Sequence, residues 1–195
     1  FEIHYIGSKT GIEKELIGNF DIPYYGISSG KLRRYFDVKN FTDPFRILKG
    51  YSEAKKLIKK IKPDVIFSKG GFVTVPVVKA ASRQKVPCVL HESDISPGLA
   101  NRLCIPSATA ICANFPETIA NLPEDKAYLT GTPIRSELFS GNRLKGLDFC
   151  GFTANKPVIL VIGGSLGSVR VNEAVREILP KLLEKYQVIH LCGKD

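Results

Sequence analysis

The segment that decides the fold begins Asp64-Val-Ile-Phe-Ser-Lys-Gly-Gly-Phe72 and ends Val86-Pro-Cys-Val-Leu-His-Glu92, Ser93-Asp-Ile-Ser-Pro-Gly98. Its pattern predicts a strand, a glycine-bearing loop, an apolar helix through Ser82, a second strand and a polar loop. Two short buried strands, each followed by a polar loop, are typical of a parallel α/β sheet with a site at its carboxyl edge. We therefore predict an α/β protein whose candidate site lies on these two loops.

The same alternation of strands and helices runs along the whole chain. Outside the deciding segment, strands are expected at residues 2–6, 22–27, 109–113 and 126–130, and helices at residues 11–17, 42–61, 97–105 and 116–121. Residues 136–155 have a weak, polar pattern that resembles a domain boundary. After it come a continuous apolar strand at 157–162, expected to be buried on both faces, a glycine-rich turn, a helix at 169–185 and a strand at 187–192. We therefore predict an N-terminal Rossmann-like domain over residues 1–135 and the start of a second Rossmann-like domain over residues 136–195.

The composition indicates a soluble or peripheral protein. The 195 residues include no run of roughly 18 apolar residues that could span a bilayer, and no signal-peptide pattern precedes the first strand. The five cysteines lack the short spacings of zinc or redox motifs, and the three histidines stand apart, so we predict no metal site. The chain starts inside a strand-like run at Phe1 and contains no methionine, which we interpret as an internal fragment.

The net charge of +9 is concentrated in one segment. Residues 31–62 hold eleven Lys or Arg residues against three acidic residues, a local balance of +8. Such a segment indicates an anionic partner, and its interleaved apolar residues favour an anionic membrane surface over nucleic acid. The alternative is that these apolar side chains complete the core. The candidate membrane patch consists of Leu32, Arg33, Arg34, Phe36, Phe45, Arg46, Leu48 and Lys49.

The turn Gly163-Gly-Ser-Leu-Gly-Ser168 is a candidate diphosphate site. It stands between a buried strand and a helix, where backbone N–H groups and the helix dipole favour an anion. No Gly-Lys-Ser/Thr follows, so it is not a Walker loop, and the next strand ends too late for a dinucleotide fingerprint. The alternative is a tight turn that only packs.

Two further loops carry candidate functional groups. In the first, Gly70 and Gly71 permit close approach of an anionic ligand and Lys69 could add charge, although a strained turn explains the glycines equally well. In the second, His91 and Glu92 are candidates either for acid–base catalysis or for fixing the loop. Asp94, also in the second loop, is placed to meet a sugar hydroxyl.

Four motifs in this order resemble the MurG family of bacterial N-acetylglucosaminyltransferases: Ser68-Lys-Gly-Gly-Phe-Val-Thr-Val-Pro76, His91-Glu-Ser-Asp-Ile-Ser-Pro-Gly98, Gly131-Thr-Pro-Ile-Arg135 and Gly163-Gly-Ser-Leu-Gly-Ser168. The resemblance implies a two-domain GT-B fold with UDP-N-acetylglucosamine bound between the domains. It implies transfer of the sugar, with inversion, to the muramyl 4-hydroxyl of lipid I, which forms lipid II. It also implies a peripheral location at the cytoplasmic face of the bacterial cell membrane, with anionic lipids as partners and no cofactor beyond the nucleotide sugar.

The resemblance also implies roles for particular residues. Donor binding falls to Asp94, Arg135, Gly164 and Ser165, with Ser165 at the diphosphate. The loop thought to hold the acceptor diphosphate consists of Lys69, Gly70, Gly71 and Phe72. Asp94 stands where many relatives have asparagine, and Phe72 replaces a tyrosine found in some, so those two contacts differ here. The segment around Phe45 and Leu48 matches the family's membrane-docking patch.

The catalytic residue is left unassigned by the sequence. The family's proposed base is expected before Phe1, and the groups that hold uracil and ribose are expected after Asp195, so this chain alone is expected to be inactive. Three other interpretations stay open: another GT-B UDP-sugar transferase with a lipid acceptor, a non-catalytic nucleotide- or membrane-binding module and, disfavoured by the loop spacing, a dinucleotide-dependent oxidoreductase.

Overall fold

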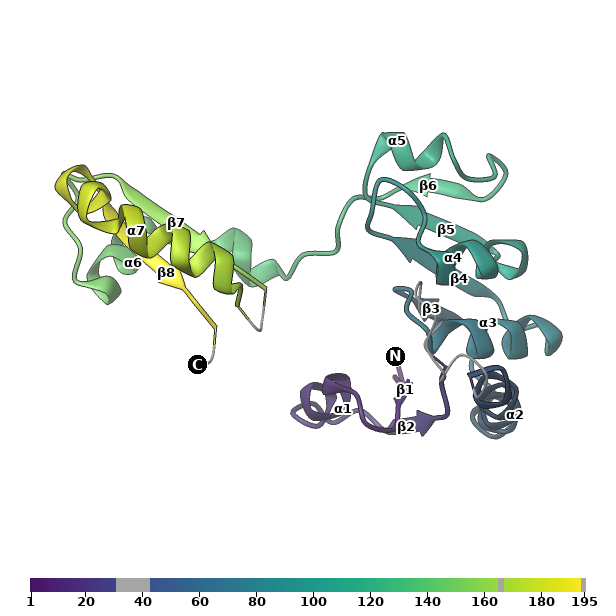
Figure 1. Cartoon of the computed structure of the whole chain (residues 1–195). Helices are drawn as coiled ribbons and strands as arrows, with labels where there is room; N and C mark the ends of the chain where they lie inside the picture. Colours follow the sequence, from purple (N-terminus) through teal and green to yellow (C-terminus); the bar gives the residue numbers. More distant parts are fainter. Residues whose placement is uncertain (31–42, 165–166, 194–195) are drawn as a thin grey trace. The chain divides into compact units, whose positions relative to one another are not determined.

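A computed structural model of the chain describes residues 1–30, 43–164 and 167–193 (Figure 1). The chain forms two compact units, Phe1–Pro133 and Ile134–Asp195, and the predicted domain boundary lay between residues 135 and 136. Strands and helices alternate in both units, and every strand pair in the described part of the chain is parallel. The predicted α/β class is therefore confirmed.

The described residues of the first unit form two parallel sheets. The smaller pairs β1 (Tyr5–Ser8) with β2 (Tyr24–Ile27), which are connected by α1 (Ile12–Ile17). The larger has four strands in sequence order, β3 (Ile66–Ser68), β4 (Cys88–Glu92), β5 (Ala110–Ala113) and β6 (Ala127–Leu129). Because all four run in one direction, the loops that follow them meet at the carboxyl edge of this sheet.

The first strand lies later in the chain than its apolar pattern predicted. We expected residues 2–6, ended by Gly7, whereas β1 covers Tyr5–Ser8 and Gly7 pairs with Gly26 inside it. A Cβ at Gly7 would meet the ring of Tyr24, so glycine here serves close packing in the strand.

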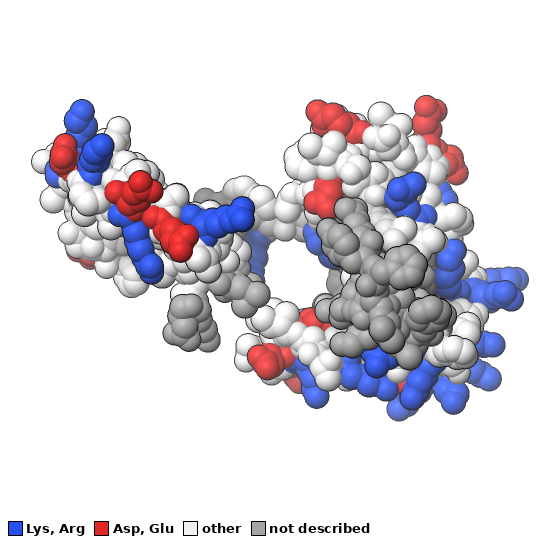
Figure 2. Space-filling view, viewed as in Figure 1, with Lys and Arg blue, Asp and Glu red and all other residues white. Residues whose placement is uncertain are grey.

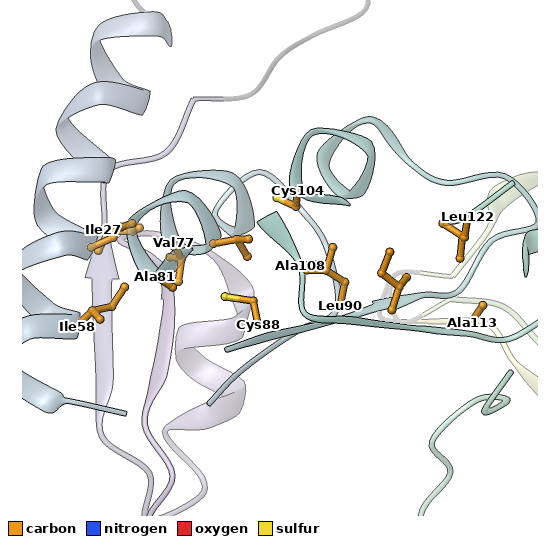
Figure 3. Packing of buried hydrophobic residues seen from close by; sticks show 14 residues of the cluster. Ile27, Ile58, Val77, Ala81, Cys88, Leu90, Cys104, Ala108, Ala113 and Leu122 are labelled. Atoms are coloured by element: carbon orange, nitrogen blue, oxygen red, sulfur yellow. The ribbon is translucent and has the colours of Figure 1, made fainter. Parts of the chain in front are cut away.

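The core of the first unit lies between the four-stranded sheet and its helices (Figure 3). The helices are α2 (Asp43–Ile61), α3 (Thr74–Arg83), α4 (Leu99–Cys104), the 3-10 helix η2 (Ile105–Ser107) and α5 (Pro116–Ile119). Val78, Ala80 and Ala81 of α3 are fully buried, as are Cys88 and Leu90 of β4. The small alanines let α2 pack closely on α3.

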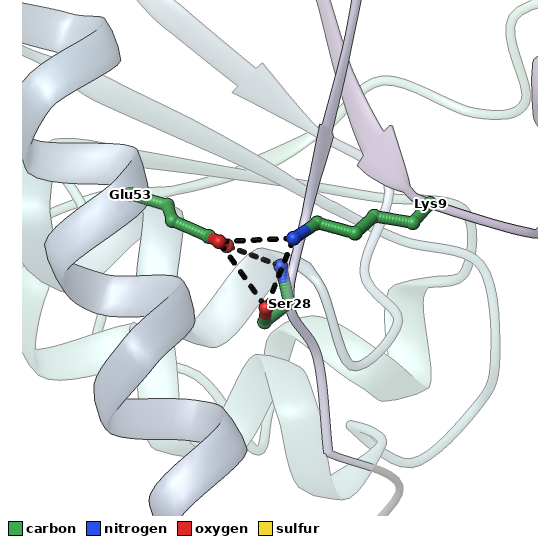
Figure 4. A network of polar contacts seen from close by, with 3 residues as sticks. All are labelled: Lys9, Ser28 and Glu53. Atoms are coloured by element: carbon green, nitrogen blue, oxygen red, sulfur yellow. Dashed lines mark hydrogen bonds and ion pairs between the residues drawn. The ribbon is translucent and has the colours of Figure 1, made fainter.

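Helix α2 is attached to the end of β2 by one carboxylate (Figure 4). Glu53 accepts hydrogen bonds from the Ser28 backbone N–H at 2.5 Å and from Lys9 Nζ at 3.0 Å. Burial alone would raise the pKa of Glu53, but the bonds from Ser28 and Lys9 outweigh it and lower that pKa. Gly50 makes this approach possible, because an added Cβ would lie 2.0 Å from the Ser28 carbonyl oxygen.

The second unit contains a helix that the sequence pattern did not predict. Its elements are the 3-10 helix η3 (Ser136–Ser140), α6 (Arg143–Cys150), β7 (Val158–Ile162), α7 (Val169–Lys185) and β8 (Gln187–Leu191), with β7 parallel to β8. Helix α6 falls in the stretch that we interpreted as a polar boundary. It has an N-cap at Asn142, whose Oδ1 accepts from the Lys145 N–H at 3.1 Å, and a left-handed C-cap at Gly151. These two cap residues were the sequence features from which the helix could have been predicted.

The prediction that β7 is buried on both faces is wrong in the described part of the chain. Val158, Leu160 and Ile162 are 37%, 55% and 62% exposed, whereas Ile159 and Val161 between them are partly buried. The alternation of exposed and partly buried residues shows that one face of β7 is open to solvent while the other is partly covered. A continuous apolar run therefore did not distinguish one covered face from two.

Candidate functional site

The loop after β3 is shaped by two successive glycines. Gly70 and Gly71 have φ values of +91° and +92°, a region that residues with a Cβ rarely adopt. Thr74 Oγ1 donates to the Gly70 carbonyl at 2.7 Å, and Ser68 Oγ accepts from the Gly70 N–H at 3.2 Å. Gly70 is thus held from both sides, while a Cβ at Gly71 would meet nothing within 4 Å. The loop offers a fixed backbone with open space beside Gly71.

His91 connects this loop to two others at the same edge of the sheet. The imidazole is 2% exposed and lies in β4, with Nδ1 3.1 Å from Lys69 Nζ and Nε2 3.2 Å from the Gly131 carbonyl oxygen. Lys69 Nζ also donates to Ser93 Oγ at 3.1 Å. The structure therefore brings together Lys69, His91 and the start of the 131–135 motif, which the sequence placed far apart.

Glu92 fixes the loop after β4. Its carboxylate accepts from the backbone N–H groups of Ser93, Asp94 and Gly98 at 2.9, 3.1 and 2.9 Å, and from Asn101 Nδ2 at 2.8 Å. Burial of this 4% exposed residue would raise its pKa, but the hydrogen bonds from Asn101 and the three N–H groups outweigh burial, and the pKa is lowered.

Because both oxygens of this carboxylate are occupied by donors, the geometry favours loop fixing over acid–base catalysis for Glu92. Asn101, which sequence reasoning missed, is its buried side-chain donor and stands in the first turn of α4. Its place on the helix that directly follows the loop was the sequence feature from which a role in the site could have been predicted.

The described residues among the predicted donor-binding set, Asp94, Arg135 and Gly164, are exposed and are divided between the two units. Asp94 lies in the first unit, where its backbone is held by Glu92 and by Thr118 Oγ1, which donates to the Asp94 carbonyl at 2.9 Å. Arg135 and Gly164 lie in the second unit. Ser165, the predicted diphosphate contact, lies outside the described residues.

In the glycine-rich turn before α7, Gly164 and Gly167 have different surroundings. Gly167 has a φ of +73°, and an added Cβ would lie 2.2 Å from the Cys192 carbonyl oxygen at the end of β8. Gly164 is exposed, and a Cβ there would meet nothing within 4 Å. Asn172 Nδ2 donates to the same Cys192 carbonyl at 2.9 Å, which attaches the first turn of α7 to β8. Gly167 therefore serves packing, whereas Gly164 borders free space.

The described part of the candidate membrane patch lies on the first turns of α2 and is open to solvent. Phe45 is 75% exposed and Leu48 is 66% exposed, and Arg46 and Lys49 beside them are exposed as well. Leu32, Arg33, Arg34 and Phe36 lie outside the described residues. The alternative that Phe45 and Leu48 complete the core is therefore wrong for this unit.

The described residues contain neither a candidate metal site nor a candidate membrane span. Within residues 1–30, 43–164 and 167–193, no three His, Cys, Asp or Glu side chains are grouped so that they could hold a metal ion. In the same residues, no helix combines the length and the apolar character needed to cross a bilayer.

Comparison with known families identifies both parts of the chain. The glycosyltransferase family 28 N-terminal domain matches residues 1–113, and the glycosyltransferase family 28 C-terminal domain matches residues 158–195. The UDP-N-acetylglucosamine–N-acetylmuramyl-(pentapeptide) pyrophosphoryl-undecaprenol N-acetylglucosamine transferase of Lachnoclostridium phytofermentans is 70% identical over 194 residues, and that of Lachnospira eligens is 63% identical. Each match covers 100% of this chain and 55% of the relative. The chain thus spans about half the length of the curated relatives it matches.

Solved structures give the same assignment. The crystal structure of Acinetobacter baumannii MurG matches 100% of this chain and 51% of its own, with a TM-score of 0.66 and 28% identity. The UDP-GlcNAc 2-epimerase of Neisseria meningitidis covers 97% of this chain with a TM-score of 0.60, but its 15% identity shows a shared fold alone. The fold is that of GT-B enzymes, with the start of a second domain after the first. The chain belongs to glycosyltransferase family 28 and, within that family, to the MurG group.

Proposed function

We propose that this chain is part of an enzyme that transfers N-acetylglucosamine from UDP-N-acetylglucosamine to the muramyl 4-hydroxyl of lipid I, which forms lipid II for peptidoglycan. The observation that carries the proposal is the 70% identity, over the whole chain, to a transferase whose name states this donor and this acceptor. In the reaction, a base takes the proton of the 4-hydroxyl while its oxygen attacks the sugar C1 from the face opposite UDP. The bond from C1 to the UDP oxygen breaks, so the configuration at C1 inverts.

On the donor side, we assign the diphosphate to the turn before α7. Gly164 borders open space, and the 17-residue helix α7 starts directly after Ser168. Backbone N–H groups and the positive end of a helix dipole stabilise negative charge, which UDP gains as it leaves. Ser165, Arg135 and Asp94 complete the proposed donor contacts.

On the acceptor side, we assign the diphosphate of lipid I to the loop Lys69, Gly70, Gly71 and Phe72. The support is the open space beside Gly71 and the exposed Lys69 side chain. An ammonium group and a glycine backbone that a ligand can approach closely suit a phosphate group. Since His91 and Glu92 are both engaged in hydrogen bonds within the loops, we do not assign the base to either residue.

We also propose that the protein docks peripherally on the cytoplasmic face of the cell membrane through the first turns of α2. Phe45 and Leu48 would enter the interface while Arg46 and Lys49 meet anionic headgroups. Figure 2 shows Lys and Arg side chains gathered over the part of the first unit that contains α2 and α3. One turn beyond Leu48, a hollow of about 330 Å³ is lined by Tyr51, Lys79, Ser82, Arg83 and Ser107.

The test is a transfer assay with this chain completed to the length of its relatives. Labelled UDP-N-acetylglucosamine and a lipid I analogue should give labelled lipid II, and diacylglycerol offered as the acceptor should give no product. Transfer to diacylglycerol with none to the lipid I analogue would identify a different lipid glycosyltransferase and would overturn the proposal.

A further inference from the structure

We infer that His91 is a positioning residue: as the neutral imidazole protonated on Nε2, it holds the Lys69 ammonium in the acceptor loop and connects that loop to Gly131. The inference rests on the proposed function of the loop as the acceptor-diphosphate site. It gives His91 a role through Lys69 and no part in proton transfer.

The partners of the imidazole determine which nitrogen carries the proton. An ammonium group can only donate, so His91 Nδ1, 3.1 Å from Lys69 Nζ, must be the acceptor. A carbonyl oxygen can only accept, so Nε2, 3.2 Å from the Gly131 oxygen, must carry the hydrogen. Only the neutral Nε2–H tautomer satisfies both contacts. The ring is buried in the middle strands of the sheet, where β4 pairs with β3 and β5.

The two groups that hold Lys69 are neutral, so its charge stays available. Nζ donates to His91 Nδ1 and to Ser93 Oγ, and an ammonium has three hydrogens. Within the described ranges 1–30, 43–164 and 167–193, Lys69 forms no ion pair. A carboxylate in place of the imidazole would hold the lysine equally well but would neutralise it. The arrangement therefore leaves one donor and a full positive charge for an anion beside Gly70 and Gly71.

Fixing Lys69 in advance should strengthen anion binding. A free lysine side chain samples many rotamers, and part of that conformational entropy is lost when a ligand orders it. Since His91 and Ser93 already order the ammonium, less of that entropy is lost when the ligand binds.

The contact with Gly131 extends the same network to the end of the first unit, which is Pro133. Gly131 has a φ of +70°, and its N–H donates to the Ala113 carbonyl at 3.1 Å.

The first test is spectroscopic and does not depend on enzyme activity. Long-range ¹H–¹⁵N spectra of the ¹⁵N-histidine-labelled 195-residue chain should show His91 as the Nε2–H tautomer at neutral pH. Lys69→Met should shift the Nδ1 resonance of His91 as it loses its donor, whereas Lys60→Met, an exposed lysine on α2, should leave it unchanged. An Nδ1–H tautomer or an imidazolium at His91 would overturn the inference.

The second test separates positioning from catalysis in the chain completed to the length of its relatives. In place of His91, asparagine would put an amide oxygen near the position of the imidazole Nδ1. Glutamine would instead put an amide N–H near the position of Nε2. His91→Gln should therefore lose the Lys69 contact and raise the KM for the lipid I analogue about tenfold with little change in kcat, as Lys69→Met should. His91→Asn should retain most of the acceptor affinity.

The double variant decides whether the two residues act together. Lys69→Met combined with His91→Gln should be no worse than Lys69→Met alone, because both remove one interaction. A fall in kcat of a hundredfold or more in both His91 variants, independent of Lys69, would show proton transfer by His91 and would contradict positioning. If the tautomer is as inferred but neither Lys69→Met nor His91→Gln changes the acceptor KM, the network exists and the assigned function of the loop is wrong.

Discussion

At the scale of single residues, Glu92 shows how a buried acid can be kept ionised by a loop that it organises. Its carboxylate is the common acceptor for three backbone N–H groups between Ser93 and Gly98 and for the Asn101 amide. An unpaired buried carboxylate would be strongly destabilising, and unpaired buried N–H groups would be costly as well. The acid and the loop therefore stabilise each other.

We expect Glu92→Gln to lower the free energy of unfolding by about 2–3 kcal/mol at pH 7, because hydrogen bonds to a charged group contribute more than those to an amide. The lowered pKa of Glu92 sets the pH dependence. Its stabilisation is fully present above the ordinary carboxyl value of 4.5 and is lost as the pH falls through the lower folded-state pKa. The difference between wild type and variant should therefore shrink in acid.

Urea unfolding followed by circular dichroism between pH 7 and pH 3 would measure this difference. Glu124→Gln, the same change at an exposed position, should stay within about 0.5 kcal/mol of wild type at every pH. Equal effects of the two substitutions, or a Glu92 difference that is constant with pH, would show that the Glu92 carboxylate does not hold the loop.

Most residues of the candidate site, although not Asn101, could be named from the sequence, but their connections could not. Strand ends and glycines drew attention to Lys69, His91 and Glu92 individually. The distance from Lys69 to His91 depends on the register in which Ser68 of β3 pairs with Leu90 of β4, and no local pattern encodes that register. The partnership with Gly131, 40 residues along the chain, depends in addition on the order of the strands.

At the scale of elements, prediction succeeded where one periodicity ran without interruption. Helix α7 was expected at 169–185 and is observed there, because its apolar stripe repeats over 17 residues. Helix α6 was missed, since it has eight residues of which Leu147 alone is buried, so its apolar stripe is weak. Strand β7 was found, yet its burial was overestimated, because burial depends on neighbouring elements and not on the strand's own residues.

The turn between β7 and α7 allows a prediction that separates packing from ligand approach. Gly167→Ala should destabilise the second unit by more than about 2 kcal/mol, since alanine disfavours a φ of +73° and its Cβ would collide with the Cys192 carbonyl. Gly164→Ala should leave the fold unchanged, because a Cβ there has open space. In the completed enzyme it should instead raise the KM for UDP-N-acetylglucosamine about tenfold, as the methyl group occupies the approach to the backbone.

Urea unfolding of both variants of the chain, with the donor KM of both in the completed enzyme, gives the comparison. Equal destabilisation by the two alanines would contradict the structural distinction between the glycines. An unchanged donor KM in a folded Gly164→Ala enzyme would remove this glycine from the proposed diphosphate site.

At the scale of the whole molecule, the charge and the exposed apolar residues favour the same partner. The chain has a net charge of +9, and residues 31–62 hold most of the excess. Many large apolar side chains are exposed in both units, so exposure alone does not mark a membrane surface. Phe45 and Leu48 combine high exposure with two basic neighbours on the same turns of α2, Arg46 and Lys49, within the segment that holds most of the excess charge.

That combination predicts which apolar pair binds vesicles. Each basic residue near an anionic surface contributes about 1 kcal/mol, and each large apolar side chain that enters the interface adds a comparable amount or more. Phe45→Ala with Leu48→Ala should therefore lower the partition of the chain onto phosphatidylglycerol-containing vesicles at least about tenfold. Added salt should weaken binding of the wild-type chain, since the basic residues are screened.

The second unit provides a matched control for this experiment. Leu138 and Phe139 of η3 are 71% and 78% exposed, as open as Leu48 and Phe45, and η3 itself contains no basic residue. Leu138→Ala with Phe139→Ala removes the same two side-chain types and should leave sedimentation with the vesicles unchanged. If both double variants lose binding equally, or if phosphatidylcholine vesicles bind the wild-type chain as well as anionic ones do, apolar exposure without the neighbouring charge is sufficient. The first turns of α2 would then have no special role in docking.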